Sequence, residues 1–215
     1  MRYKLVIFDF DGTLADSFPW FLSSINQVAD QFQFRRIEES DLDTIRGLEA
    51  GQIIKFLGVP LWKAPVIGKH MRALMARDIS RIRLFEGVDR MLQELAEQGV
   101  VIALVSSNSS ENIRQILGPA NAGLIRYYQC GVTIFGKQAK LRKVLQISGI
   151  APEEAIYIGD EIRDLQAAKT ENIAFGAVAW GYTKPESLFA QGPQIVFTSM
   201  DEIARKLESI DVNHG

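Results

Sequence analysis

Six short apolar runs recur along the 215-residue chain, and patterns typical of amphipathic helices lie between most of them. Apolar runs of this length are typical of strands that are buried on both faces. A chain in which such strands alternate with helices forms a parallel sheet with helices on both sides. We therefore predict an α/β fold with a doubly wound parallel sheet. The predicted strands are residues 5–8, 100–105, 132–135, 155–158, 173–178 and 195–197.

One interval, residues 16–85, contains no convincing strand pattern, and its apolar residues recur at helical spacing. A simple connection between two strands does not need about 70 residues, so we predict an inserted α-helical cap domain. Such a cap would exclude water and select substrates, whereas a purely structural helical layer is the alternative. The predicted division is an α/β core of residues 1–15 and 86–215 and a cap of residues 16–85.

The composition favours an ordinary soluble globular protein, with 47% apolar residues, 23% charged residues and a formal net charge of −2. Without a long basic run, nucleic acid is not an expected partner. No apolar stretch reaches the roughly 18–20 residues of a membrane span, and the N-terminus does not resemble a signal peptide. The single cysteine, Cys130, fits a structural role in a reducing compartment. We predict a cytoplasmic protein that does not bind membranes; the sequence does not indicate its oligomeric state.

Two aspartates, Asp9 and Asp11, directly follow the first predicted strand. Ligands of open α/β sheets bind at the carboxyl ends of the strands, where these side chains would lie. Two carboxylates this close repel each other unless a cation or a proton lies between them. Mg²⁺ is the simplest cation for such ligands, although a plain Asp-Gly turn would explain the same residues. The motif predicts metal-assisted chemistry on an anion.

A hydroxyl group follows the second predicted strand. Ser106 ends this strand, and Asn108 with Glu111 has the spacing of a helix N-cap and its reciprocal partner. A hydroxyl that faces a helix N-terminus is suited to binding a phosphate or an oxyanion. A plain capping loop is the alternative.

Lysines and acids follow the next two predicted strands. Lys137 comes directly after Gly136, and Lys140 lies one turn further along; either could neutralise an anionic substrate, or could simply be solvated. Asp160 and Asp164 follow the strand 155–158 and share one face if a helix begins there. Chance explains each polar strand end alone, but it explains the whole set poorly.

These residues resemble the four motifs of the haloacid dehalogenase-like hydrolase superfamily, and the helical insertion resembles its type 1 cap. The resemblance spans the core from Lys4 to about Val178, and it is strongest to phosphoglycolate phosphatase-like members. It implies a Rossmann-type core and a Mg²⁺-dependent phosphatase of a small phosphorylated metabolite. The residues that carry it are Asp9, Asp11, Gly12, Thr13, Ser106, Lys137, Gly159, Asp160, Glu161 and Asp164.

The resemblance also implies a role for each matching residue. Asp9 would be the nucleophile that forms an aspartyl-phosphate, and Asp11 the general acid and then the general base. Ser106 and Lys137 would hold the phosphoryl oxygens. The implied metal ligands are Asp9, the Asp11 carbonyl and Asp160. Asp164 would orient a metal-bound water or Lys137, and Glu161 would be a further acid next to the metal ligands. We expect Thr13, Ser107 and Asn108 to bind substrate.

Several alternatives stay open at this point. Asp11 favours phosphoryl transfer over carbon–halogen cleavage, because family members that cleave halides lack this acid. A phosphomutase would keep all four motifs, but the histidine that such mutases carry after the first motif is absent here. A phosphonatase would need a cap lysine, for which Lys55 is an unremarkable candidate.

The residues that select the substrate also stay open. Arg46, Lys69, Arg72 or Arg77 could bind a substrate carboxylate or could form a solvated helix face. A non-catalytic binding or regulatory module is the alternative from another class.

Overall fold

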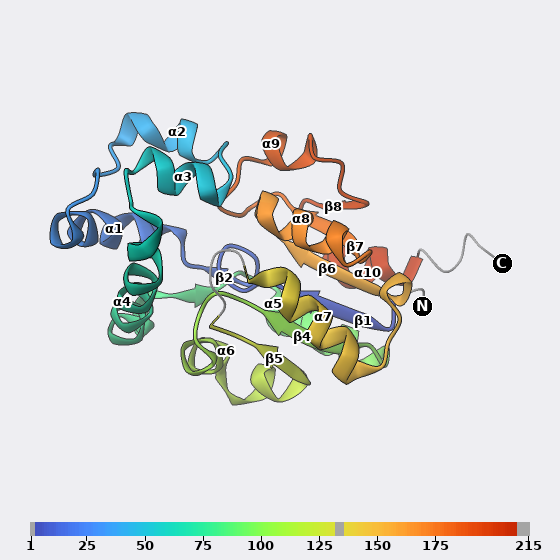
Figure 1. Ribbon diagram of the computed structural model, residues 1–215. Coiled ribbons are helices and arrows are strands. Elements are labelled where there is room, and N and C mark those ends of the chain that lie inside the picture. The colour runs from blue at the N-terminus through green and yellow to red at the C-terminus, as the bar shows by residue number, and fades with distance from the viewer. Residues whose placement is uncertain (1–2, 132–135, 210–215) are drawn as a thin grey trace.

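A computed structural model of the protein describes residues 3–131 and 136–209 (Figure 1). Six parallel strands form one sheet in the order β5-β4-β1-β6-β7-β8, so β1 lies in the centre between β4 and β6. This order places the carboxyl ends of β1, β4 and β6 side by side, which brings their polar residues together. The strands are β1 Leu5–Phe8, β4 Val101–Val105, β5 Tyr127–Gln129, β6 Ala155–Gly159, β7 Ala174–Val178 and β8 Ile195–Phe197.

Five of the predicted strands are confirmed with small shifts at their ends, and the sixth, residues 132–135, lies outside the described residues. β5 was not predicted. It is a three-residue strand at the edge of the sheet, its side chains are only half-buried, and two of its residues are tyrosines followed by a glutamine. A half-buried edge strand this short needs no apolar run, so no sequence signal marks it.

Alternate side chains of the central strand pack into two separate apolar layers, one on each face of the sheet. Val6 and Phe8 of β1 pack with α5, α6 and α10, whereas Leu5 and Ile7 pack with α7, α8 and α9. This alternation follows from the two-residue period of a strand, and it confirms the doubly wound core. The helices are α5 Val88–Glu97, α6 Ser110–Leu124, α7 Lys137–Ser148, α8 Ile162–Thr170, α9 Pro185–Phe189 and α10 Glu202–Ser209.

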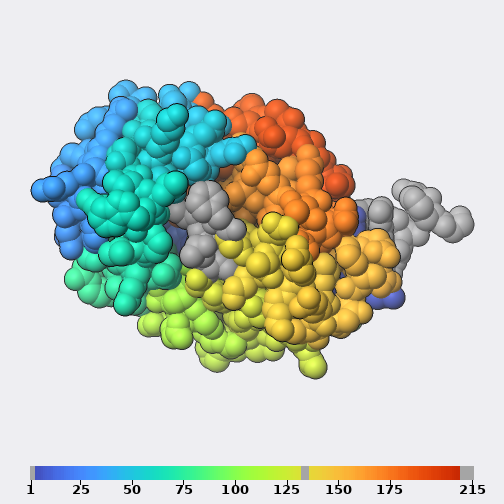
Figure 2. Space-filling view, viewed as in Figure 1, coloured from blue at the N-terminus to red at the C-terminus, as the bar shows by residue number. Residues whose placement is uncertain are grey.

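Four helices form the cap, which covers one end of the core (Figure 2, blue to teal). The cap has a small apolar cluster of its own, centred on Ile25, Ile37, Ile45 and Leu57. The cap helices are α1 Phe18–Phe32, α2 Leu42–Ile45, α3 Ala50–Phe56 and α4 Ala64–Arg77. Short 3₁₀ turns are η1 Glu39–Asp41, η2 Leu61–Lys63, η3 Ile79–Arg81 and, in the core, η4 Pro152–Glu154.

The two chain crossings between core and cap pair with each other. β2 (Ala15–Asp16) and β3 (Arg83–Leu84) form a two-stranded antiparallel ribbon at these crossings. The expectation of no strand between residues 16 and 85 is therefore wrong for β3, because a two-residue strand is too short to produce a sequence pattern. The ribbon ties both ends of the cap to the segment that directly follows Asp9 and Asp11.

Cys130 is half-buried, and burial raises the pKa of its thiol to about 11, in keeping with the predicted structural role. Among the described residues, no helix is both long enough and apolar enough to cross a membrane.

Candidate active site

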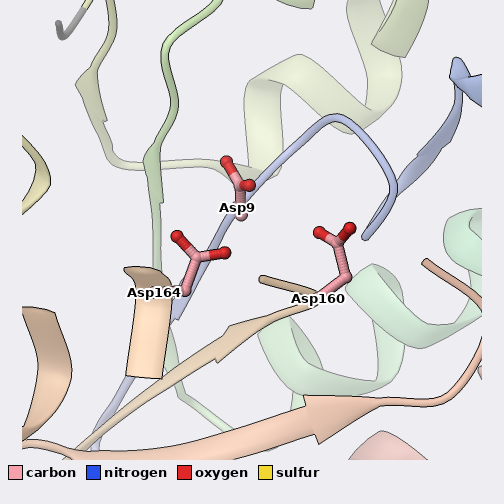
Figure 3. A group of neighbouring side chains, drawn as sticks. All are labelled: Asp9, Asp160 and Asp164. Carbon is pink, nitrogen blue, oxygen red and sulfur yellow. The ribbon is translucent and has the colours of Figure 1, made fainter. Parts of the chain in front are cut away.

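Three carboxyl groups meet at the carboxyl ends of β1 and β6 (Figure 3). Asp9 follows β1, Asp160 follows β6, and Asp164 lies in the first turn of α8. Each offers one oxygen, and these oxygens lie within 4.8 Å of one another. All three side chains are buried, with exposed fractions of 2%, 0% and 0%. Buried oxygen ligands in such a group suit a small divalent cation such as Mg²⁺.

Burial is the largest influence on the pKa values of these three aspartates. It raises the pKa of Asp9 and of Asp160, and it raises the pKa of Asp164 to about 6. Neighbouring carboxylates add to this effect at Asp160, whereas Lys137 opposes it at Asp9 and Asp164. A bound cation would replace protons here, so the chemistry of these donors fits a metal site.

Lys137 is the cation that the structure places among these acids. Its Nζ lies 2.7 Å from Asp9 Oδ2 and also pairs with Asp164. Burial lowers the pKa of Lys137, but Asp164 and Asp9 outweigh burial, so the net pKa is raised and the lysine stays charged. Lys140 instead reaches Gln129, at 3.4 Å. Of the two candidate lysines, only Lys137 lies at the site.

Asp160 is held rigidly by groups from two distant segments. The Thr13 hydroxyl donates to Asp160 Oδ1 at 2.8 Å, and the backbone N–H of Tyr182 donates to Oδ2 at 2.8 Å. A Cβ on Gly12 or on Gly181 would collide with the Asp160 side chain, so both positions need glycine. Thr13, predicted to bind substrate, thus supports Asp160.

Asp11 lies beside the three-carboxylate group and has different partners. Asn108 Nδ2 donates to its Oδ2 at 3.1 Å, and the Ser17 side chain also hydrogen-bonds it. Burial raises the pKa of Asp11, and the bonds from Ser17 and Asn108 partly oppose this. Asn108 Nδ2 also contacts Met75 Sδ of cap helix α4 at 2.8 Å, so the cap reaches this acid.

Ser106 directly follows β4, at the strand end where it was predicted, and is fully buried. Its Oγ accepts a 3.1 Å hydrogen bond from the backbone N–H of Asn108. The predicted N-cap at Asn108 is wrong by one residue. Ser109 caps α6 instead, because its side chain accepts from the backbone N–H of Asn112 at 3.2 Å.

Glu161 and Asp164 form a reciprocal cap at the start of α8, which fixes the turn that carries Asp160. Glu161 also pairs with Arg163 at 2.6 Å, and Arg163 lowers the pKa of Glu161 against the opposing effect of burial. Tyr157 of β6 donates to Asp164 Oδ1 at 3.1 Å. Sequence reasoning did not assign Tyr157 or Arg163, since a tyrosine inside an apolar strand looks like core.

The cap arginines bind backbone carbonyls of the core. Arg46 donates from Nε to the Tyr182 carbonyl at 2.9 Å and from Nη2 to the Gly181 carbonyl at 3.1 Å. Arg72 donates to the Ser107 carbonyl at 3.3 Å. Both arginines therefore tie the cap to loops that carry site residues, whereas Lys69, Arg77 and Lys55 are exposed.

The sequence model of the family described as "Haloacid dehalogenase-like hydrolase" matches residues 6–178. The chain belongs to this family. A phosphoglycolate phosphatase from Synechococcus elongatus is 28% identical over 208 residues, covering 96% of this chain and 98% of that protein. One from Xanthomonas campestris pv. campestris is 30% identical, covering 85% and 86%. The predicted family membership and the predicted class of enzyme, a phosphatase of this family, are confirmed.

The fold of the family is equally plain in solved structures. The crystal structure of a Lactobacillus plantarum protein superposes with a TM-score of 0.82 at 21% identity, covering 95% of this chain and 99% of that chain. CbbY from Rhodobacter sphaeroides, in complex with phosphate, superposes with a TM-score of 0.71 at 21% identity, covering 94% and 96%. The α/β core with a helical cap is therefore confirmed.

Proposed function

We propose that the protein hydrolyses a small phosphate monoester of the phosphoglycolate type through a phosphorylated Asp9. The observation that carries the proposal is the different surroundings of the two aspartates that follow β1, Asp9 and Asp11. Asp9 faces the charged Lys137, whereas Asp11 faces the neutral groups of Asn108 and Ser17. This difference supports Asp9 as the nucleophile and Asp11 as the acid that carries a proton.

The reaction has two halves. In the first, an Asp9 oxygen forms a bond to phosphorus, the ester P–O bond breaks, and Asp11 gives its proton to the leaving alcohol oxygen. In the second, Asp11 takes a proton from water as that water attacks phosphorus, which releases phosphate and restores Asp9. Lys137, which pairs with Asp9, and the buried Ser106 would hold the phosphoryl oxygens.

We propose Asp9, Asp160 and the Asp11 carbonyl as ligands of Mg²⁺, with Asp164 oriented by Lys137 and Tyr157. The ion would offset the repulsion between the Asp9 carboxylate and the anionic phosphoryl group. Thr13 and the Glu161 cap would hold the Asp160 turn in place before the ion binds.

We further propose that residues 16–85 act as the substrate-selecting cap on a core of residues 1–15 and 86–215. The phosphoglycolate phosphatase relatives support a phosphorylated carboxylic acid as substrate. Ser107 and Asn108, which lie under cap residues Arg72 and Met75, are proposed substrate contacts. A cytoplasmic location remains our expectation.

Replacing Asp9 by Asn should abolish turnover with and without Mg²⁺, because the amide cannot attack phosphorus. Asp30→Asn is the matched control, since Asp30 is an exposed aspartate of cap helix α1 that pairs with Arg36. Each variant is assayed with phosphoglycolate and with p-nitrophenyl phosphate, and its fold is checked by thermal unfolding. Retained activity in folded Asp9→Asn would disprove the covalent mechanism. Lack of Mg²⁺-dependent turnover by the unaltered protein would favour a binding module.

A further inference from the structure

Tyr182 links the two site acids Asp160 and Asp11 to the cap. It is more than 160 residues away from Asp11 in sequence. Its backbone N–H holds Asp160, and its hydroxyl lies 2.9 Å from the Ser17 hydroxyl. Its ring packs so closely on Gly12 that a Cβ there would lie 2.6 Å from Tyr182 Cδ1. The residue is half-buried and fixed at three points.

The hydroxyl of Tyr182 reaches Asp11 through Ser17. Ser17 is fully buried and hydrogen-bonds the Asp11 carboxyl. A carboxylate can only accept, so Ser17 donates to ionised Asp11 and is left to accept from Tyr182. A tyrosine hydroxyl carries its proton at neutral pH, so Tyr182 can donate to Ser17 across the 2.9 Å that separates their oxygens. Together with Asn108, which also donates to Asp11, this chain of hydrogen bonds orients the Asp11 carboxyl.

The cap holds Tyr182 from the other side. Arg46 donates to the Tyr182 carbonyl at 2.9 Å, and the ring centroids of Phe18 and Phe21 lie 4.8 Å and 5.8 Å from that of Tyr182. Arg46 also lies over the Phe18 ring, at 5.4 Å from its centroid. The position of the tyrosine hydroxyl therefore depends on how the cap sits on the core.

We propose that Tyr182 is a positioning residue, which orients Asp11 through Ser17 so that its proton points at the leaving oxygen of the substrate. The proposal rests on the proposed phosphatase function. Proton transfer by a side chain depends steeply on its placement, and a misdirected acid loses much of its contribution. Tyr182 would link this placement to the seating of the cap.

The test uses leaving groups that differ in their need for a proton. The Tyr182→Phe variant removes only the hydroxyl, and kcat/KM is measured for an alkyl ester, phosphoglycolate, and for p-nitrophenyl phosphate. An alkoxide must be protonated as it leaves, whereas nitrophenolate need not be. We expect a loss of about 10–100-fold for the alkyl ester and less than about threefold for the aryl ester.

Two further variants sharpen the test. Ser17→Ala should show the same selective loss, and the double variant should lose no more than either single one, because both act through one chain of hydrogen bonds. Tyr127→Phe is the matched control, since the Tyr127 hydroxyl bonds the Ile147 carbonyl at the far edge strand. It should leave both rates unchanged.

Equal losses for both esters in Tyr182→Phe would show a merely structural role and would overturn the inference. So would unchanged rates, or additive losses in the double variant. These outcomes leave the proposed function standing, because the unaltered enzyme still turns over. An unaltered protein that hydrolyses neither ester would instead remove the proposed function and this inference with it.

Discussion

Asp9 and Asp11 flank Phe10, whose side chain is fully buried. Both aspartates come just after β1, at the carboxyl end of the central strand of the sheet. Their partners nevertheless differ. Lys137 favours the charged form of Asp9, whereas the groups that hydrogen-bond Asp11 within the described part of the chain, Asn108 and Ser17, are neutral. Two aspartates that are alike in sequence thus acquire different partners, Lys137 for Asp9 and Asn108 for Asp11, from segments far along the chain.

Lys137 provides a test at the scale of a single residue. Replacing it by Met would leave Asp9 and Asp164 buried without their cation, so we expect unfolding at neutral pH to become about 3–5 kcal/mol easier. Activity should fall by at least about 10²-fold. Lys140→Met, in the same helix, should change stability by no more than about 0.5 kcal/mol. Urea unfolding and kcat/KM measure both effects, and equal effects at the two lysines would contradict the assignment.

At the scale of elements, the local signals that sequence carries decide what can be predicted. Central strands such as β1 and β6 are continuous apolar runs, and their buried polar ends stand out against them. Short elements with half-buried side chains, β5 and β3, carry no such signal. Tyr182 could not be assigned for another reason. Its partners Ser17 and Arg46 belong to other segments, and only the folded chain brings them together.

The contact between the end of α2 and the loop after β7 provides a test at the scale of elements. Arg46 bonds two carbonyls, and its own carbonyl accepts from the Lys184 N–H at 2.8 Å. Hydrogen bonds from a charged group contribute about 1.5–3 kcal/mol each. Arg46→Gln should therefore loosen the cap, and amide hydrogens of residues 181–184 should exchange at least about tenfold faster.

Hydrogen-exchange mass spectrometry measures this change. Arg77→Gln serves as the control, because Arg77 is an exposed arginine of cap helix α4. Unaltered exchange in residues 181–184 of Arg46→Gln would show that the apolar contacts of Phe18 and Phe21 hold the cap without the arginine.

In the whole molecule, the residues of the candidate site could be predicted from the sequence, whereas the contacts between the cap and the core could not. Asp9, Lys137 and Asp160 were predicted together because parallel strands end at one edge. The cap was predicted as a domain, but its contacts with the core depend on side chains such as Arg46 and Arg72. In the sequence alone, arginines at these positions are equally typical of a solvent-exposed helix face. Sequence therefore predicts the chemical groups of this enzyme better than it predicts the contacts that enclose them.

Stability of the whole molecule should depend jointly on pH and Mg²⁺. The pKa of Asp164 is raised from 3.8 to about 6 by burial, and those of Asp9 and Asp160 are also raised. Between about pH 4 and pH 6, Asp164 keeps a proton in the folded protein that it has lost in the unfolded chain. The resulting stabilisation is complete below about pH 4 and is lost as the pH rises through about 6. The metal-free protein should accordingly become less stable across this window.

Mg²⁺ should reverse this loss, because it takes the place of the protons. We expect the rise in Tm on adding Mg²⁺ to be small near about pH 5 and several degrees larger near about pH 7.5. Thermal unfolding with Mg²⁺ or with a chelator, at both pH values, measures the difference. Asp160→Asn, which removes one carboxylate of the group, should abolish the Mg²⁺ effect at both. A rise in Tm that is the same at both pH values would mean that the ion binds somewhere other than these three aspartates.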